Sequence, residues 1–389
     1  MQTNKPVLFL LPSLLVILAL QTACGPDDKE PMSRDQILET MARTNAYFME
    51  KWPDVGKRIV TNRERASNIW TRAVYYEGLM ELYDLDPRPE YYDYAVRWGE
   101  FHEWNLRDGE TYTRNADNQC AGQTYLDLYR IDPQPERMHY IKASVDSMMA
   151  TEKIDDWDWI DALQMAMPVF ARLAVIMGDS AYFDRMHQMY LYTKNEHGEN
   201  GLYNPEDGLW WRDADYDPPY TEPNGEDCYW SRGNGWVLAA LLRVMELLPE
   251  GHSYMEEYRS TFLDMCEALV KVQRKDGFWN VSLHDPDHFG GPETTGTALF
   301  VYGMAWGINR GILPADEYLP VVNRAWNAMV RKAVRPDGSL GYVQSTGKDP
   351  AAGQPVTYKS VPDFEDYGLG CFLLAGSEMY RLGPAYLRK

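Results

Sequence analysis

The residue with the strongest case for chemistry is Asp161, in the run 157–168, WDWIDALQMAMP. Its neighbours in the sequence are mainly tryptophan, isoleucine, leucine and methionine. A carboxyl withdrawn from water has a raised pKa, because its charged form loses hydration. Such a group can give and take protons near neutral pH. The alternative is that Asp161 only opens a helix, since acidic side chains favour first turns.

A second carboxyl, Asp117, stands in the run 115–125, NADNQCAGQTY, just before another expected helix. It could cap that helix. It could instead work beside Asp161, because enzymes that cleave glycosides typically pair two carboxylates. Each residue stands at the start of an inner helix of the fold expected below. We therefore expect the two carboxyls at the same end of the molecule.

The run 230–236, WSRGNGW, combines an arginine with two tryptophans at a helix start. The planar guanidinium of Arg232 suits a carboxylate, and Trp230 and Trp236 offer faces on which a sugar ring can stack. We interpret these three residues, with Asn234, as substrate-binding. The alternative is a helix entry with core tryptophans and a surface arginine.

Two further runs begin expected inner helices. The run 70–76, WTRAVYY, contributes Trp70 and Tyr75 as candidate stacking walls, and the run 290–297, GGPETTGT, contributes Thr294. Thr294 could line a pocket, or this run could simply cap its helix.

The elements that must position these residues are helices with regular interruptions, because apolar residues recur at helical spacing between turn signatures. About twelve helices are expected, and alternate ones are richer in glycine, alanine and small residues. This rhythm favours an all-α fold, an (α/α)6 toroid of six helical hairpins. The expected inner helices are 70–83, 122–129, 161–177, 235–248, 295–310 and 367–382. Short hairpins are expected near 209–212 and 341–344.

The first residues form a separate segment. Lys5, an apolar run over 7–20 and the small residues before Cys24 are typical of a secretory signal. We expect a signal peptide over 1–23, a lipidated Cys24, a tether over 24–33 and one catalytic domain over 34–389. Ordinary cleavage without lipidation is the alternative, because Gln21 stands where lipoprotein signals usually have an aliphatic residue. The expected location is the bacterial cell envelope, periplasmic or at the cell surface.

Composition narrows the partners of this 389-residue chain. Its formal net charge of −20 argues against nucleic acid and against anionic membrane surfaces. An anionic substrate would need a local basic group. The cysteines show no metal-ligand spacing, so a structural metal site is not expected. The sequence implies no organic cofactor either. The 13 Trp and 27 Tyr suit sugar rings as well as a core. A monomer is expected.

The chain resembles the unsaturated rhamnogalacturonyl hydrolases, glycoside hydrolase family 105, and the related unsaturated glucuronyl hydrolases. The resemblance rests on five runs in order and spans about residue 37 to the end. These runs are 117–125, 161–168, 230–241, 293–300 and 366–370.

The resemblance implies a six-hairpin toroid that removes a Δ4,5-unsaturated uronic acid from the non-reducing end of lyase-generated oligosaccharides. By resemblance, Asp161 is the general acid and base that hydrates the C4=C5 bond, and Asp117 is a second essential carboxylate. Arg232 would clamp the substrate carboxylate. Some members place a histidine in the loop after Gly-Leu-Tyr, whereas here 201–203 leads to Trp210, Trp211 and Arg212. Galacturonyl and glucuronyl substrates both remain open.

Three other functions fit parts of the pattern. An inverting hydrolase of saturated glycosides would use Asp161 as acid and Asp117 as base. A non-catalytic, lipid-anchored glycan-binding protein would need only the tryptophans. A sugar epimerase would need paired histidines at inner-helix ends, for which His284 and His288 are the candidates.

Overall fold

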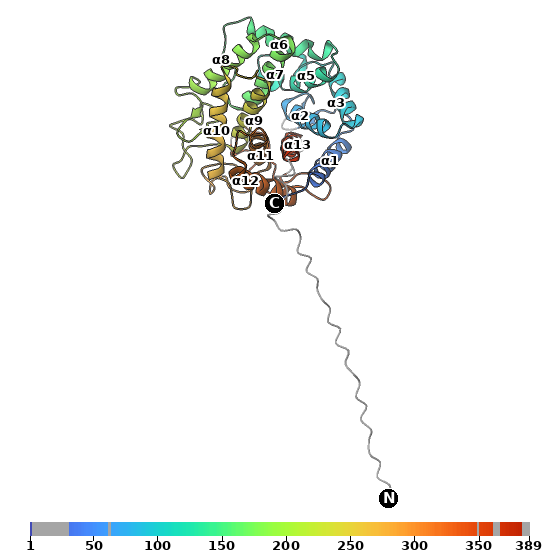
Figure 1. Cartoon of the computed structure of the whole chain (residues 1–389), viewed down its shortest axis with the longest axis vertical. Helices are drawn as coiled ribbons and strands as arrows, with labels where there is room; N and C mark the ends of the chain where they lie inside the picture. Colours follow the sequence, from blue (N-terminus) through green and yellow to red (C-terminus); the bar gives the residue numbers. More distant parts are fainter. Residues whose placement is uncertain (2–30, 61–63, 348–349, 361–365, 383–389) are drawn as a thin grey trace.

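The structure, a computed structural model, describes residues 1, 31–60, 64–347, 350–360 and 366–382. The helices form two concentric rings, which confirms the predicted toroid (Figure 1). The inner ring consists of α2 (Trp70–Leu85), α5 (Ala121–Ile131), α7 (Asp161–Met177), α9 (Ser231–Leu247), α11 (Thr294–Asn309) and α13 (Asp366–Arg381). The outer ring consists of α1 (Arg34–Lys51), α3 (Pro89–Phe101), α6 (Glu136–Met149), α8 (Ala181–Asn195), α10 (Met255–Lys271) and α12 (Ala315–Ala328).

The two rings differ in how their helices are buried. Outer helix α3 buries one face, made by Tyr91, Tyr94, Ala95, Trp98 and Gly99, at the spacing of an amphipathic helix. Inner helix α11 is buried all round, from Thr294 to Ile308. A helix enclosed on all sides needs apolar and small residues on every face, which explains the composition of the inner helices.

The ring closes where α13 packs against α2. A Cβ on Gly370 would lie 2.2 Å from the carbonyl oxygen of Val74, so only glycine permits this approach. At the start of the same two helices, Arg72 and Asp366 form an ion pair of 2.8 Å, with both side chains fully buried. The first and last inner helices are thus joined by close backbone packing and by charge.

Polar side chains fill the centre of the inner ring. Glu77 of α2 pairs with Arg243 of α9 at 3.0 Å and accepts a hydrogen bond of 2.9 Å from Gln164 of α7. Arg243 also donates to Gln123 of α5 at 2.9 Å. Burial raises the pKa of Glu77, and the guanidinium of Arg243 opposes that shift. Four inner helices therefore share one buried polar network, which we call the central network.

The segments that precede the inner helices carry the short elements. These are β1 (Ile59–Val60) with β2 (Glu64–Arg65), η1 (Arg107–Gly109), α4 (Ala116–Gln119), and β3 (Tyr203–Asn204) with β4 (Leu209–Trp210). The hairpin expected near 209–212 is present, whereas 341–344 forms no strand in the described chain. Outer helix α12 ends at Ala328, and the chain continues as the π-helical turn η2 (Met329–Ala333).

The signal peptide expected over 1–23 and most of the tether over 24–33 fall outside the described residues. No helix in the described part of the chain has the length and apolarity needed to span a bilayer.

The central network yields a stability prediction. Replacing Glu77 by alanine leaves Arg243 charged and buried without its partner, so unfolding in urea should become easier by about 3–5 kcal/mol. The control is Glu267→Ala, which removes an exposed i,i+4 partner of Lys271 and should leave the urea midpoint unchanged. Equal midpoints for Glu77→Ala and the unsubstituted protein would contradict a structural role for this pair.

Candidate active site

Asp161 lies at the entry of α7, at the N-terminal end of the inner ring, which we call the mouth. It is the first helical residue, and Ile160 is the cap. Its side chain is 13% exposed and pairs with Arg212, whose Nε lies 3.6 Å from Oδ2. Neither atom makes a hydrogen bond, although both are buried. Burial raises the pKa of Asp161, and Arg212 and then Arg232 oppose that shift.

The loop after β4 is fastened to this entry by backbone contacts. The amide of Ile160 donates to the carbonyl of Arg212 at 3.0 Å, and Trp159 forms an antiparallel bridge with Asp213. Arg212 also bonds the carboxylate of Asp213. The guanidinium is therefore held beside Asp161 from both its backbone and its side chain.

Asp117 lies in the short helix α4, which packs against α7. Asn115, not Asp117, caps this helix by accepting from the amide of Asn118. The pKa of Asp117 is raised to about 7, first by burial and next by the charge of Asp161. Arg212 is the largest of the charges that oppose this shift. The structure thus brings the two predicted carboxyls close enough for the charge of Asp161 to act on Asp117.

Arg232 lies beside this pair but faces a loop. Its Nη1 and Nη2 donate to the carbonyls of Gln344 and Ser345 at 2.9 and 3.0 Å, and the residue is 1% exposed. Its guanidinium carbon sits 4.4 Å from the ring centroid of Trp230, whose Nε1 donates to Gln344. Arg232 and Trp230 therefore brace the 344–345 loop. The clamp role expected for Arg232 stays a prediction.

Asn234 holds the β3–β4 hairpin and is fully buried. Its amide accepts from the backbone nitrogen of Trp210 at 2.9 Å and donates to the carbonyls of Trp210 and Trp230 at 3.0 and 3.1 Å. All the hydrogen bonds it makes are to backbone groups. Asn234 therefore fixes the hairpin, which corrects the predicted contact with substrate.

Two other predicted contacts also belong to the fold. Tyr75 is fully buried against α1, where its hydroxyl donates to Asn45 at 2.7 Å and its ring stacks on Phe48. Thr294 is fully buried and donates to the carbonyl of Gly341 at 2.8 Å. Neither side chain faces the mouth, because α2 and α11 are surrounded by protein on every side.

Trp70 retains partial exposure at the entry of α2. Its ring meets Trp236 edge-on at 6.2 Å and Tyr367 at 5.3 Å. Trp236 itself is fully buried, and its Nε1 has no hydrogen-bond partner. Of the predicted tryptophans, Trp70 has the most surface to offer a sugar ring, with Trp236 supporting it from below.

The site residue that sequence reasoning missed is Arg212. Its backbone path follows from contacts with Ile160 and Asp213, which no local pattern reports. The available signal was its place in the loop where some similar proteins carry a histidine. A polar residue of a different type in that loop is itself a candidate site residue.

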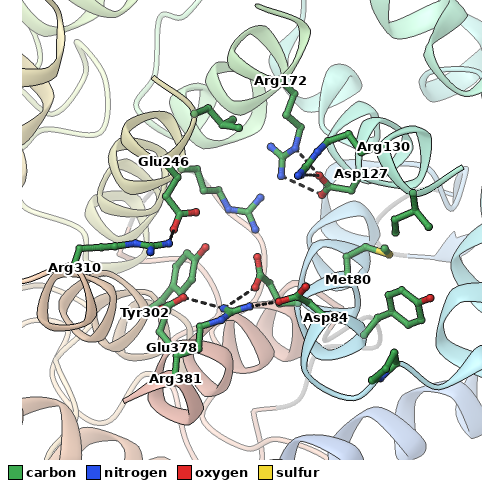
Figure 2. A pocket seen from close by; sticks show the side chains of 16 residues that line it. Met80, Asp84, Asp127, Arg130, Arg172, Glu246, Tyr302, Arg310, Glu378 and Arg381 are labelled. Atoms are coloured by element: carbon green, nitrogen blue, oxygen red, sulfur yellow. Dashed lines mark hydrogen bonds and ion pairs between the residues drawn. The ribbon is translucent and has the colours of Figure 1, made fainter. Parts of the chain in front are cut away.

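A cavity of about 590 Å³ lies at the opposite end of the ring (Figure 2). Residues from the last turns of inner helices line it, among them Asp84, Arg130 and Arg381. Its charges are mutually paired: Arg381 bonds Glu81, Asp84 and Glu378, and Arg172 bonds Asp127. Because neither Asp117 nor Asp161 borders it, we place the chemistry at the mouth.

The ionisable side chains at the mouth are suited to proton transfer. Two carboxyls with raised pKa values lie beside one guanidinium, and aromatic rings stand at the entry. Across the described part of the chain, no group of three or more His, Cys, Asp or Glu side chains could hold a metal ion.

Comparisons with known proteins place this arrangement in a family. The model of Glycosyl Hydrolase Family 88 matches residues 40–383, and the chain belongs to this family. An unsaturated 3S-rhamnoglycuronyl hydrolase from Formosa agariphila is 30% identical over 335 residues, covering 80% of this chain and 84% of that protein.

Two further relatives agree. A second enzyme with that name, from an Alteromonas species, is 31% identical and covers 82% of this chain and 79% of its own length. A solved family 88 glycosyl hydrolase from Bacteroides vulgatus is 34% identical, with a TM-score of 0.82 over 90% of this chain and 99% of that one. The predicted family resemblance and the predicted class, a glycoside hydrolase of unsaturated uronyl sugars, are confirmed.

The raised pKa of Asp117 predicts a stability cost that depends on pH. The folded state holds this proton up to about pH 7, whereas an unfolded aspartate loses it near pH 4. Folding is therefore penalised progressively as pH rises through this window, and the penalty is complete above pH 7.

Asp117→Asn removes the ionisable group. At pH 8 this variant should be more stable than the unsubstituted protein by about 1–3 kcal/mol, and at pH 4 the two should be alike. Urea unfolding at both pH values measures the difference. A gain of the same size at both pH values would show that the carboxyl charge is not its cause.

Proposed function

We propose that the protein removes a Δ4,5-unsaturated uronyl residue from a rhamnose-containing oligosaccharide, with Asp161 as acid and base. The observation that carries the catalytic assignment is the buried pair of Asp161 and Asp117 at the mouth, with raised pKa values. The two similar enzymes named unsaturated 3S-rhamnoglycuronyl hydrolases support rhamnose as the leaving sugar.

The chemistry is hydration of an enol ether. Protonated Asp161 donates its proton to C4 while water attacks C5, and the resulting carboxylate takes a proton from that water. The C5 hemiketal then opens to a ketone. C1 becomes a hemiacetal that collapses to an aldehyde and releases the leaving sugar with its hydroxyl. One proton donor and one water suffice, so no nucleophile at C1 is required.

Asp117 has the complementary role. Because burial and the charge of Asp161 raise its pKa, Asp117 takes up a proton more readily while Asp161 is ionised. A second carboxyl in this position can orient the attacking water or a ring hydroxyl. An inverting mechanism on saturated glycosides remains the second candidate, because paired carboxyls also fit it.

A substrate panel separates these two functions. Unsaturated disaccharides that end in rhamnose, with and without sulfate, should lose their ultraviolet absorbance, whereas saturated counterparts should stay intact. Reaction in ¹⁸O-labelled water should place the label at C5. Cleavage of saturated substrates with label at C1 would overturn the hydration mechanism.

Asp161→Asn tests the acid and base. Since the amide cannot exchange the proton, kcat should fall by about 10²–10⁴-fold, while the dissociation constant for the disaccharide should stay within a few-fold. Asp155→Asn, which alters an exposed acid on the segment before α7, is the matched control and should retain full activity. Full activity in Asp161→Asn would remove this residue from the reaction.

For the N-terminal segment, we infer export to the cell envelope and lipidation of Cys24, which the run before that cysteine supports. Expression in a bacterial host with labelled palmitate should label the full chain and not the Cys24→Ala variant. A mature protein that begins at another residue and carries no label would contradict lipidation.

A further inference from the structure

Arg212 is distinguished from Arg72 and Arg232 at the mouth by its partial exposure and by its loose contact with Asp161. Arg72 is fully buried in its pair with Asp366, and both terminal nitrogens of Arg232 bond loop carbonyls. Arg212 holds Asp213 through Nη1, but its Nε makes no hydrogen bond. Its side chain is 14% exposed and lines a cavity of about 360 Å³ together with Trp159 and His197.

The contact between Arg212 and Asp161 is loose. At 3.6 Å the pair attracts by charge but is too long for a hydrogen bond. Oδ2 of Asp161 is likewise without a partner. Two buried, complementary groups that face each other without a hydrogen bond would gain from a further partner beside them, since unmade bonds at buried atoms are costly.

The substrate supplies such a group. A Δ4,5-unsaturated uronic acid carries its carboxylate on C5, the carbon that water attacks next to the protonated C4. A guanidinium that binds this carboxylate therefore holds the alkene within reach of the acid beside it. A protein of net charge −20 also needs a local cation for an anionic sugar.

We propose that Arg212 binds the carboxylate of the unsaturated uronyl residue and exchanges its ion pair with Asp161 for one with the substrate. This inference rests on the proposed function and adds a substrate contact in the loop after β4. Nε and the Nη atoms of a guanidinium can bind a carboxylate in two-pronged fashion, which lysine cannot reproduce.

The exchange has a consequence for the proton on Asp161. The charged groups around this carboxyl are Arg212 and Asp213 from the loop, Arg232 from α9 and Asp117 from α4. In the free enzyme Arg212 favours the ionised form of Asp161. Once the substrate carboxylate neutralises Arg212, Asp161 keeps a proton more readily, which is the form that the reaction needs.

The test compares the unsaturated acid with its neutral methyl ester. The unsubstituted protein should prefer the acid, and Arg212→Met should raise KM for the acid about ten- to hundredfold while changing KM for the ester little. Arg212→Lys should restore part of the preference. Arg130→Met, which removes an exposed arginine at the opposite end of the ring, controls for the loss of one positive charge.

The pH profiles provide a second readout that a merely structural role would not give. In Arg212→Met the alkaline limb of kcat/KM for the acid should move to higher pH, because the free enzyme has lost the charge that favours ionised Asp161. The limb of kcat should stay in place, because bound substrate already neutralises Arg212 in the unsubstituted protein.

If Arg212→Met turns over too slowly for kinetic analysis, its affinity for the substrate is measured instead. In an Asp161→Asn background, calorimetry with the unsaturated disaccharide should show at least tenfold weaker binding when Arg212→Met is added. Unchanged discrimination between acid and ester, or unchanged binding, overturns the role of Arg212. Failure of the proposed function is distinct from this, because then the unsubstituted protein itself turns over no unsaturated disaccharide.

Discussion

The ion pair between Glu77 and Arg243 is the constraint on which the ring depends. Two charges removed from water cost several kcal/mol each, and only close pairing with further hydrogen bonds offsets that cost. Gln123 and Gln164 provide those bonds from two other inner helices. Any displacement of α2, α5, α7 or α9 would leave a buried charge unsatisfied, so the central network fixes their register. It also fills the ring axis, which separates the mouth from the cavity at the opposite end.

The mouth differs from the central network, because its buried carboxyls are not fully compensated by partners. Asp117 and Asp161 are buried without full compensation, and their raised pKa values record the resulting free-energy cost. A rigid ring can sustain this cost because its stability comes from elsewhere. A carboxyl held in a close ion pair with a guanidinium favours its ionised form and is therefore a poor acid. Function here depends on two buried carboxyls whose charges are only partly compensated, in a scaffold held together by other ion pairs.

Sequence reasoning succeeded where local pattern decides the outcome. Helical spacing and turn residues indicated the alternation of inner and outer helices, and the position of Asp161 at a helix start placed it at the mouth. The same reasoning failed on helices that are buried on all sides, because such helices have no alternation of apolar and polar faces. Tyr75 lies on an inner helix with no exposed face, so spacing could not tell whether it pointed to the mouth or to α1. Asn234 failed for a related reason, because its partner Trp210 lies 24 residues away.

Arg212 shows why a loop can complete a site that helices begin. Helix starts bring Asp161 to the mouth, but the arginines that they bring, Arg72 and Arg232, are buried in the packing of the ring. A loop can supply a partly exposed arginine because its side chains need not satisfy helix–helix contacts. The backbone hydrogen bond between Ile160 and Arg212 then fixes the position of the loop relative to α7. The site therefore combines a carboxyl positioned by the scaffold with a guanidinium positioned by the loop, and a change at residue 212 would alter both substrate binding and the pKa of Asp161.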